Sequence, residues 1–243
     1  MAGKKYKAAL AAVDRDRLYS PLEAVQVLKS VETAKFDESV EVHFRLGLNV
    51  RHAEEQLRGS LSLPHGTGRS RVIAVFAQGD HAREAEEAGA DYVGGDELGA
   101  RVLEGWTDFD VALATPDMMG VVGKLGRVLG PQGKMPNPRS GTITFDIGKA
   151  VAEIKSGKIE YRTENRAGLV HVVIGKKSFT VEQIVENYGA LVEEIVRAKP
   201  ASAKGRYIQS ATITSTMGPG VRVDPSRTRD LLEELATTEA GSV

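Results

Sequence analysis

The clearest pattern in the chain is an alternation of apolar and polar residues between positions 39 and 48. Valine, phenylalanine or leucine occupies every even position there, whereas the odd positions hold serine, glutamate, histidine, arginine and glycine. Because successive side chains of a strand point to opposite faces, this pattern predicts a half-buried strand with one polar face. Related alternation predicts further strands at 57–63, 158–164, 169–175 and 210–216.

Two amphipathic helices are predicted beside these strands. Residues 20–31 begin with Ser20 as the N-cap and Pro21 at the first helical position, and residues 180–199 begin with a capping box at Thr180. In the second helix, apolar residues with helical spacing predict the buried stripe: Val181, Ile184, Val185, Tyr188, Leu191, Val192 and Ile195. These elements together predict a small sheet with helices on one face.

The middle of the chain has a different rhythm. Residues 72–77 are apolar without alternation, as expected for a strand covered on both faces, and helices and strands then alternate. Such alternation predicts a parallel sheet. We therefore expect an α/β protein of two domains: a discontinuous α+β domain of residues 1–66 and 157–243, and an inserted three-layer α/β domain of residues 67–156. Glycines at both crossings favour hinge motion.

Composition excludes several kinds of site. Among 243 residues there is no cysteine, which rules out disulfides and thiolate-bound metals, and the five histidines are too scattered to predict a metal site. We expect neither a metal nor a cofactor. No apolar run approaches the roughly 20 residues that span a bilayer, and the N-terminus is too polar for a signal peptide. The expectation is a soluble, cytoplasmic protein that is a monomer when free.

The distribution of charge is more informative than its sum of −1. Residues 118–145 hold four basic residues and no acidic one, and residues 197–229 hold seven basic residues and one acid. Either patch alone is also typical of a solvated face. Two basic blocks rich in glycine and proline nevertheless favour a polyanion partner, because pairing along a helix surface does not explain them. The first block gives candidate secondary RNA contacts: Lys124, Arg127, Lys134 and Arg139.

If helices cover one side of the predicted sheet, its other side is exposed. The outward positions are rich in hydroxyls and poor in apolar groups: Ser39, Glu41, Arg58, Ser60, Arg162, His171, Ser210, Thr212, Thr214 and Thr216. Hydroxyls can contact phosphate and the ribose 2′-OH, and a glutamate can accept a hydrogen bond from a 2′-OH or a base amino group. The alternative is a solvated sheet face whose threonines simply favour strands.

Two apolar side chains flank this face. Lys35 and Phe36, just before the first strand, offer a positive charge and a stacking ring. Met217 ends the last strand and is followed by Gly218, which would allow another backbone to approach closely. A single phenylalanine or methionine is usually part of a core, but the Gly-Pro-Gly turn leaves little chain to bury Met217.

Five segments carry a family resemblance: "KFDESVEVHFRLGLNVR", "QLRGSLSLPHGTG", "LGPQGKMPNPRSGTI", "KIEYRTENRAGLVHVVIG" and "ITSTMGPGVRVD". Over about residues 1–225 the chain resembles the bacterial L-one family of large-subunit ribosomal proteins, which form the mobile stalk beside the tRNA exit site. The resemblance implies a Rossmann-like inserted domain, binding to 23S rRNA, and assistance in releasing deacylated tRNA from the exit site. It also implies repression of the protein's own operon mRNA.

The family's RNA contacts fall on residues already noted: Lys35, Phe36, Ser39, Glu41, Ser210, Thr216, Met217 and Gly218. We add Arg162, His171 and Thr214 from the predicted polar face. Ser39 stands where the family commonly has threonine, so the hydroxyl is kept. In the inserted domain the family often reads "GPRGLMPNPK", and Gln132, Lys134 and Arg139 depart from that pattern.

Two other functions are compatible with parts of the sequence. An α/β unit could bind a nucleotide in an enzyme, but no phosphate-binding glycine motif follows the strand at 72–77, and the acidic helix start there would repel phosphate. A free-standing translational repressor would bind RNA by the same physics, and the sequence does not separate it from a ribosomal protein. The segment after Pro225 is assigned no function.

Overall fold

The computed structural model describes residues 3–164 and 167–226, with the side chain of Arg139 outside that description. The chain has a mixed α/β fold with antiparallel and parallel sheets. Internal contacts divide it into two compact units: one combines the chain up to Gly68 with the chain from Tyr161 onward, and the other is Arg69–Glu160. We call these unit 1 and unit 2.

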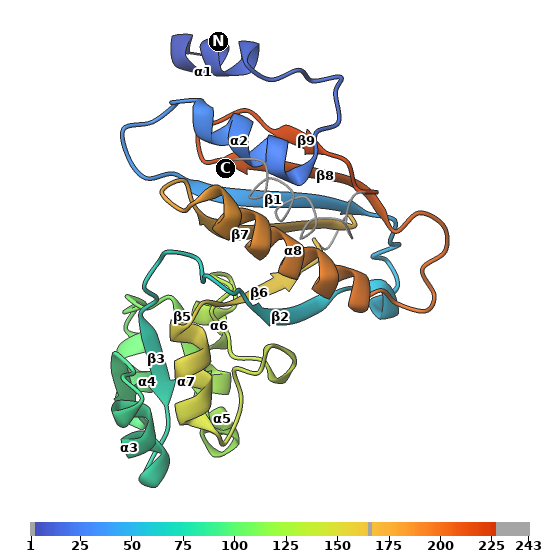
Figure 1. Ribbon diagram of the computed structural model, residues 1–243. Helices are drawn as coiled ribbons and strands as arrows, with labels where there is room; N and C mark the ends of the chain where they lie inside the picture. The colour runs from blue at the N-terminus through green and yellow to red at the C-terminus, as the bar shows by residue number, and fades with distance from the viewer. Residues whose placement is uncertain (1–2, 165–166, 227–243) are drawn as a thin grey trace. The chain divides into compact units, whose positions relative to one another are not determined.

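Unit 1 is built on a four-stranded antiparallel sheet in the order β7-β1-β8-β9 (Figure 1). Its helices and strands are α1 (Lys4–Ala11), α2 (Pro21–Ser30), β1 (Ser39–Leu46), η1 (Ala53–Glu55), β7 (Leu169–Lys176), α8 (Val181–Arg197), β8 (Ile208–Ser215) and β9 (Val221–Val223). The predicted alternation in β1 is confirmed, because its even positions are buried and its odd positions are partly or fully exposed.

The helices α2 and α8 cover the apolar face of this sheet. Both predicted capping boxes are present, at Ser20 and at Thr180, so each helix begins where the sequence indicates. Phe44, on the even face of β1, stacks on Tyr188 of α8 with ring centroids 6.2 Å apart. Six of the seven predicted stripe residues of α8 are buried, and the seventh, Val181, is half-buried at the first turn.

The strands β2 (Arg58–Ser62) and β6 (Lys158–Arg162) correct one prediction. They form a separate two-stranded sheet and do not join the four-stranded one. An isolated bridge between Thr163 and Val170, and a hydrogen bond of 2.9 Å from the N–H of Glu164 to the carbonyl of Leu169, connect the end of β6 to β7. The alternation of these segments was visible in the sequence, but alternation gives the faces of a strand and not its hydrogen-bonding partner.

Unit 2 has a parallel sheet in the order β4-β3-β5, as its alternating elements predict. Its helices and strands are β3 (Ile73–Phe76), α3 (Asp80–Glu87), β4 (Tyr92–Gly94), α4 (Asp96–Leu103), β5 (Val111–Ala114), η2 (Pro116–Met118), α5 (Met119–Val122), η3 (Gly123–Leu125), α6 (Gly126–Leu129), η4 (Pro138–Ser140) and α7 (Ile147–Lys155). Alternate residues of β3 enter two separate cores, so helices cover both faces: α3 and α7 on one, α4 to α6 on the other.

One buried polar residue of α8 holds the chain where it leaves unit 1. Asn187 is fully buried; its amide donates to the carbonyls of Gly66 and Ile174, at 3.0 and 2.7 Å, and accepts from the backbone N–H of His65 at 3.1 Å. A buried amide with its hydrogen-bonding capacity so fully used favours one conformation of the segment it binds.

We expect Asn187→Ala to lower the free energy of unfolding by about 3 kcal/mol, because three backbone groups lose their partner inside the protein. Urea denaturation followed by far-UV circular dichroism measures this. The matched control is Glu193→Gln, an exposed position of the same helix, which should change stability by less than about 0.5 kcal/mol. A loss below about 1 kcal/mol in the Asn187 variant would contradict the structural role.

Candidate nucleic-acid interface

The polar face of the four-stranded sheet collects residues from three separate parts of the chain. Cross-strand pairing sets Glu41 beside Thr214, His43 between His171 and Thr212, and Arg45 beside Ser210. The helices α2 and α8 occupy the opposite face of the sheet (Figure 1), and these residues are partly or fully exposed. The structure therefore brings together most of the predicted outward residues: Ser39, Glu41, His171, Ser210, Thr212 and Thr214.

Arg162, Arg58 and Ser60 are exceptions, because they lie on β2 and β6. The prediction that they belong to the same sheet is wrong. Arg162 is exposed and is the residue next to the Thr163–Val170 bridge, so it lies at the margin of the polar face and not within it.

At one end of this face, two loops are held together by hydrogen bonds. The N–H of Thr216 donates to the carbonyl of Ser39 at 3.1 Å, and the N–H of Ser39 donates to Thr216 Oγ1 at 3.0 Å. The pairing of β1 with β8 is thus extended just past Ser215. Lys35 and Phe36 precede this junction and Met217 follows it. Phe36 is 58% exposed and Met217 55%, although both are large apolar side chains.

Glu38 connects the two loops, and sequence reasoning missed it. Its side chain is only 1% exposed. One carboxylate oxygen accepts from the N–H of Met217 at 2.8 Å and from Ser215 Oγ at 3.3 Å; the other accepts from Thr33 Oγ1 at 2.8 Å and from Lys177 Nζ at 3.4 Å. The sequence did contain a signal: residue 38 has an even number, and the even-numbered residues of the following strand, β1, are the buried ones.

The electrostatics of Glu38 favour the carboxylate. Burial acts to raise the pKa of Glu38, but hydrogen bonds from Thr33 and the Met217 amide, together with the charge of Lys177, outweigh burial and lower the pKa below 4.5. Asp37 adds a further anchor, since its carboxylate accepts from the N–H and the hydroxyl of Ser178 at 3.0 and 2.8 Å. Phe36 is thus an exposed loop residue, and the two residues that follow it, Asp37 and Glu38, are held by hydrogen bonds.

Gly218 is required by packing within the turn. A Cβ there would lie 2.4 Å from Ser215 Oγ, so any side chain would displace the hydroxyl that binds Glu38. The space predicted for an approaching backbone is therefore taken on that side by Ser215. Thr214 Oγ1 donates within the same turn, to the carbonyls of Ser215 and Gly218 at 3.1 and 3.3 Å, and helps to fix Met217.

The hydroxyls of Thr214 and Thr216 use their protons within the protein. The proton of Thr214 is used inside the turn, and Thr216 Oγ1 contacts the carbonyl of Ser39 at 3.4 Å. Each hydroxyl oxygen has two lone pairs, so acceptor capacity is left over. Together with the carboxylate of Glu41, these oxygens suit a partner that donates hydrogen bonds, as a ribose 2′-OH or a base amino group does.

Two histidines meet in the middle of the face. His43 Nδ1 and His171 Nδ1 are 2.7 Å apart, so one ring donates a proton to the other. The rings are in an edge-to-face arrangement, with centroids 4.8 Å apart. Burial lowers the pKa of His43, the neighbouring His171 lowers it further, and Glu41 partly opposes both. The His43 imidazole is therefore neutral at neutral pH.

We expect the pKa of His43, measured by NMR titration, to lie below 6.5 and to rise in His171→Gln, because one of its two lowering causes is removed. A folded-state pKa below the unfolded value also means that this group destabilises the fold as pH falls through 6.5, since the unfolded chain binds the proton more tightly. An unchanged His43 pKa in a folded variant would contradict the paired geometry.

The predicted secondary contacts of unit 2 differ from one another. Lys124 and Arg127 are exposed, on η3 and α6. Lys134 is engaged within unit 2: its ammonium donates to the carbonyl of Thr107 at 2.9 Å and lies 5.3 Å from the centroid of the Phe109 ring. It is therefore a poorer candidate for RNA than the sequence suggested. The side chain of Arg139 is outside the described part of the structure.

Within residues 3–164 and 167–226, no three histidine, aspartate or glutamate side chains are grouped so as to hold a metal ion. In that part of the chain, no helix has the length and apolar character needed to cross a bilayer.

Comparison with known proteins gives the family of the chain. The sequence pattern of the ribosomal protein L1p/L10e family matches residues 28–219. The chain is also 58% identical over 231 residues to the large ribosomal subunit protein uL1 of Rubrobacter xylanophilus, and this alignment covers 95% of the chain and 100% of the relative. With similarity over nearly its whole length, the chain belongs to the ribosomal protein L1p/L10e family.

Proposed function

We propose that the chain binds the stalk region of 23S rRNA through the polar face of unit 1 and the two loops at its end. The observation that carries this proposal is the pair of exposed apolar side chains, Phe36 and Met217, on loops that share the buried carboxylate of Glu38. A protein gains nothing in stability from rigid, exposed apolar groups, whereas an RNA partner can cover them with a ribose or a base.

The recognition we propose depends on shape. Folded RNA displays 2′-OH groups across a wide minor groove, and the acceptor oxygens of Ser39, Glu41, Ser210, Thr214 and Thr216 can receive hydrogen bonds from them. Lys35, Arg162 and the histidine pair at His171 lie beside these acceptors. Their positive or polar groups can bind phosphate. The contribution of the Lys35 and Arg162 charges to RNA affinity weakens as the salt concentration rises.

On the ribosome, this binding would anchor the chain to the mobile stalk of the large subunit in the cytoplasm and allow it to assist the release of deacylated tRNA from the exit site. We propose that unit 1 is the discontinuous RNA-binding domain and unit 2 the inserted domain, with Lys124 and Arg127 as secondary RNA contacts. The same face would bind the chain's own operon mRNA where that RNA mimics the rRNA site, and so repress its translation.

Sedimentation tests the ribosomal part of the proposal. We expect the purified chain to migrate with large subunits through a sucrose gradient, and a Met217→Asp variant to remain near the top. A wild-type chain that binds the isolated RNA but never migrates with large subunits would support a free-standing repressor instead. Nucleotide binding by the purified chain would support an enzyme and contradict the proposal.

A further inference from the structure

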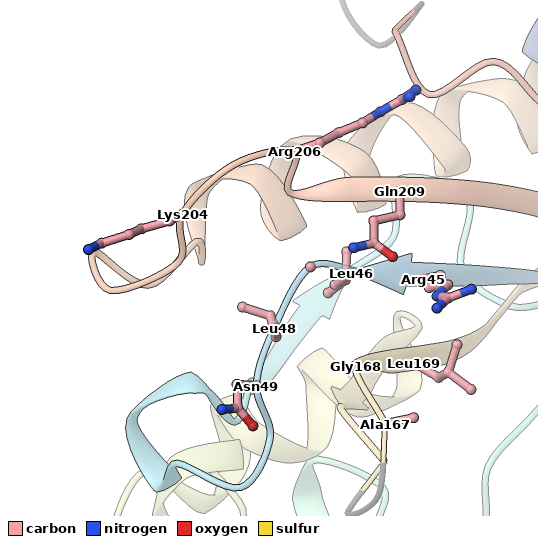
Figure 2. Close-up of a pocket in the computed structure, with 11 residues that line it drawn as sticks. Arg45, Leu46, Leu48, Asn49, Ala167, Gly168, Leu169, Lys204, Arg206 and Gln209 are labelled. Atoms are coloured by element: carbon pink, nitrogen blue, oxygen red, sulfur yellow. The ribbon is translucent and has the colours of Figure 1, made fainter.

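The end of the polar face opposite Phe36 and Met217 has a pocket that no part of the proposed function uses. It is an open cavity of ≈690 Å³ formed by three segments that are far apart in the sequence (Figure 2). Its lining is Arg45, Leu46, Gly47, Leu48, Asn49, Ala167, Gly168, Leu169, Lys204, Arg206 and Gln209. Three of these residues are cationic and none is acidic.

A strand irregularity forms this pocket. Along β1 and β8, Arg45 pairs with Ser210 but Leu46 pairs with Ile208, so Gln209 is an extra residue without a partner on β1. Bulges of this kind bend a strand and redirect side chains, often beside functional sites. Figure 2 shows Arg45 and Gln209 beside the pocket, and Lys204 and Arg206 extending outward from the loop before β8.

Two glycines that line the pocket allow main chains to approach closely. A Cβ at Gly47 would lie 2.6 Å from the carbonyl oxygen of Arg206, and one at Gly168 would lie 2.6 Å from that of Leu46. The main chains are also hydrogen-bonded, Leu46 N–H to the Gly168 carbonyl and Gly47 N–H to the Tyr207 carbonyl, each at 2.7 Å. Glycine is needed at both positions, because the neighbouring main chain takes the space that a side chain would fill.

The cations of the pocket have no partner of opposite charge. Among the described residues, no hydrogen bond or ion pair engages the side chains of Arg45, Lys204 or Arg206, and all three residues are exposed. Arg17 on the same unit, by contrast, is paired with Glu23 at 2.7 Å. The unpaired guanidinium of Arg45 beside the pocket suits a phosphodiester group, which guanidinium binds through two parallel hydrogen bonds.

We propose that this pocket binds the sugar-phosphate backbone of the same RNA that the Phe36 and Met217 loops contact, with Arg45 as the direct phosphate ligand. Lys204 and Arg206 add positive potential at the rim, and Gln209 offers its amide to a ribose. The inference rests on the proposed RNA-binding function. Ser39 and Arg45 are six residues apart on β1, or about 20 Å, so the RNA must present two contact points at that spacing.

Affinity measurements over a salt series test the pocket directly. We expect Arg45→Gln to weaken binding of the 23S stalk fragment about tenfold at low salt, and to reduce the slope of log affinity against log salt by about one. The double variant Arg45→Gln with Arg206→Gln should lower the affinity and the salt slope further. The matched control is Arg197→Gln on α8, which covers the opposite face of the sheet and should leave affinity and slope within twofold of wild type.

The outcomes separate the two proposals. If Met217→Asp weakens stalk RNA binding roughly thirtyfold but the Arg45 variants keep wild-type affinity and salt slope, the pocket is not an RNA subsite and the proposed function stands. If wild type shows no preference for the stalk fragment, the proposed function and this inference both fall. Urea denaturation of the Arg45 variants should show unchanged stability, because Arg45 is exposed and unpaired among the described residues.

Discussion

Replacing Glu38 by alanine is expected to lower the free energy of unfolding by about 3 kcal/mol, because a buried ion pair with Lys177 is broken and several donors lose their acceptor. The affected donors are the hydroxyls of Thr33 and Ser215 and the N–H of Met217. Urea denaturation measures the loss. Stalk RNA affinity should fall at least tenfold under conditions in which the variant is still folded, since Met217 is no longer held.

Glu32→Gln is the matched control for Glu38, because Glu32 is an exposed glutamate in the same segment. It should leave both stability and affinity close to wild type. Acidification gives a second control. Since the folded pKa of Glu38 is lowered, its stabilisation is complete above pH 4.5 and is lost as pH falls through the folded pKa. A Glu38 variant with wild-type stability, or with the same acid sensitivity as wild type, would contradict the role given to this carboxylate.

Replacing Met217 by aspartate is expected to weaken stalk RNA binding by about 2 kcal/mol, or roughly thirtyfold, with the free energy of unfolding nearly unchanged. The side chain is 55% exposed, so little packing is lost, whereas a carboxylate at this position repels phosphate and cannot pack on a ribose. Fluorescence anisotropy with labelled RNA measures the affinity, and circular dichroism verifies the fold.

Leu103→Asp provides the control for Met217. Leu103 lies on α4 of unit 2 and is likewise 55% exposed, so the two variants differ in place and not in exposure. We expect Leu103→Asp to bind RNA as wild type does. Equal losses in both variants would show that added negative charge alone weakens binding, and that Met217 has no particular role.

Most of the local structure of unit 1 follows from the sequence. The alternation in β1 gave its buried face, and Ser20 and Thr180 gave the starts of α2 and α8, because capping and side-chain direction depend on residues close together in the chain. The family resemblance is confirmed as well, because the chain belongs to the ribosomal protein L1p/L10e family.

What the sequence could not give depends on contacts between distant segments. Glu38 meets Ser215 and Met217 only after β1 and β8 have paired in one register, about 180 positions apart. The separate pairing of β2 with β6 has the same cause. The pocket at Arg45 requires a bulge at Gln209, which depends on the register between β1 and β8. Lys134 was predicted to contact RNA because the sequence does not show its contacts with Thr107 and Phe109.

We propose that the polar face of unit 1 recognises a particular RNA. The most direct measurement compares the affinity of the chain for the 23S stalk fragment and for an unrelated hairpin of equal length across a salt series. We predict a preference of at least a hundredfold for the stalk fragment that persists at high salt, because hydrogen bonds and packing are less screened than charges. Equal affinities that fall together as salt rises would contradict the claim.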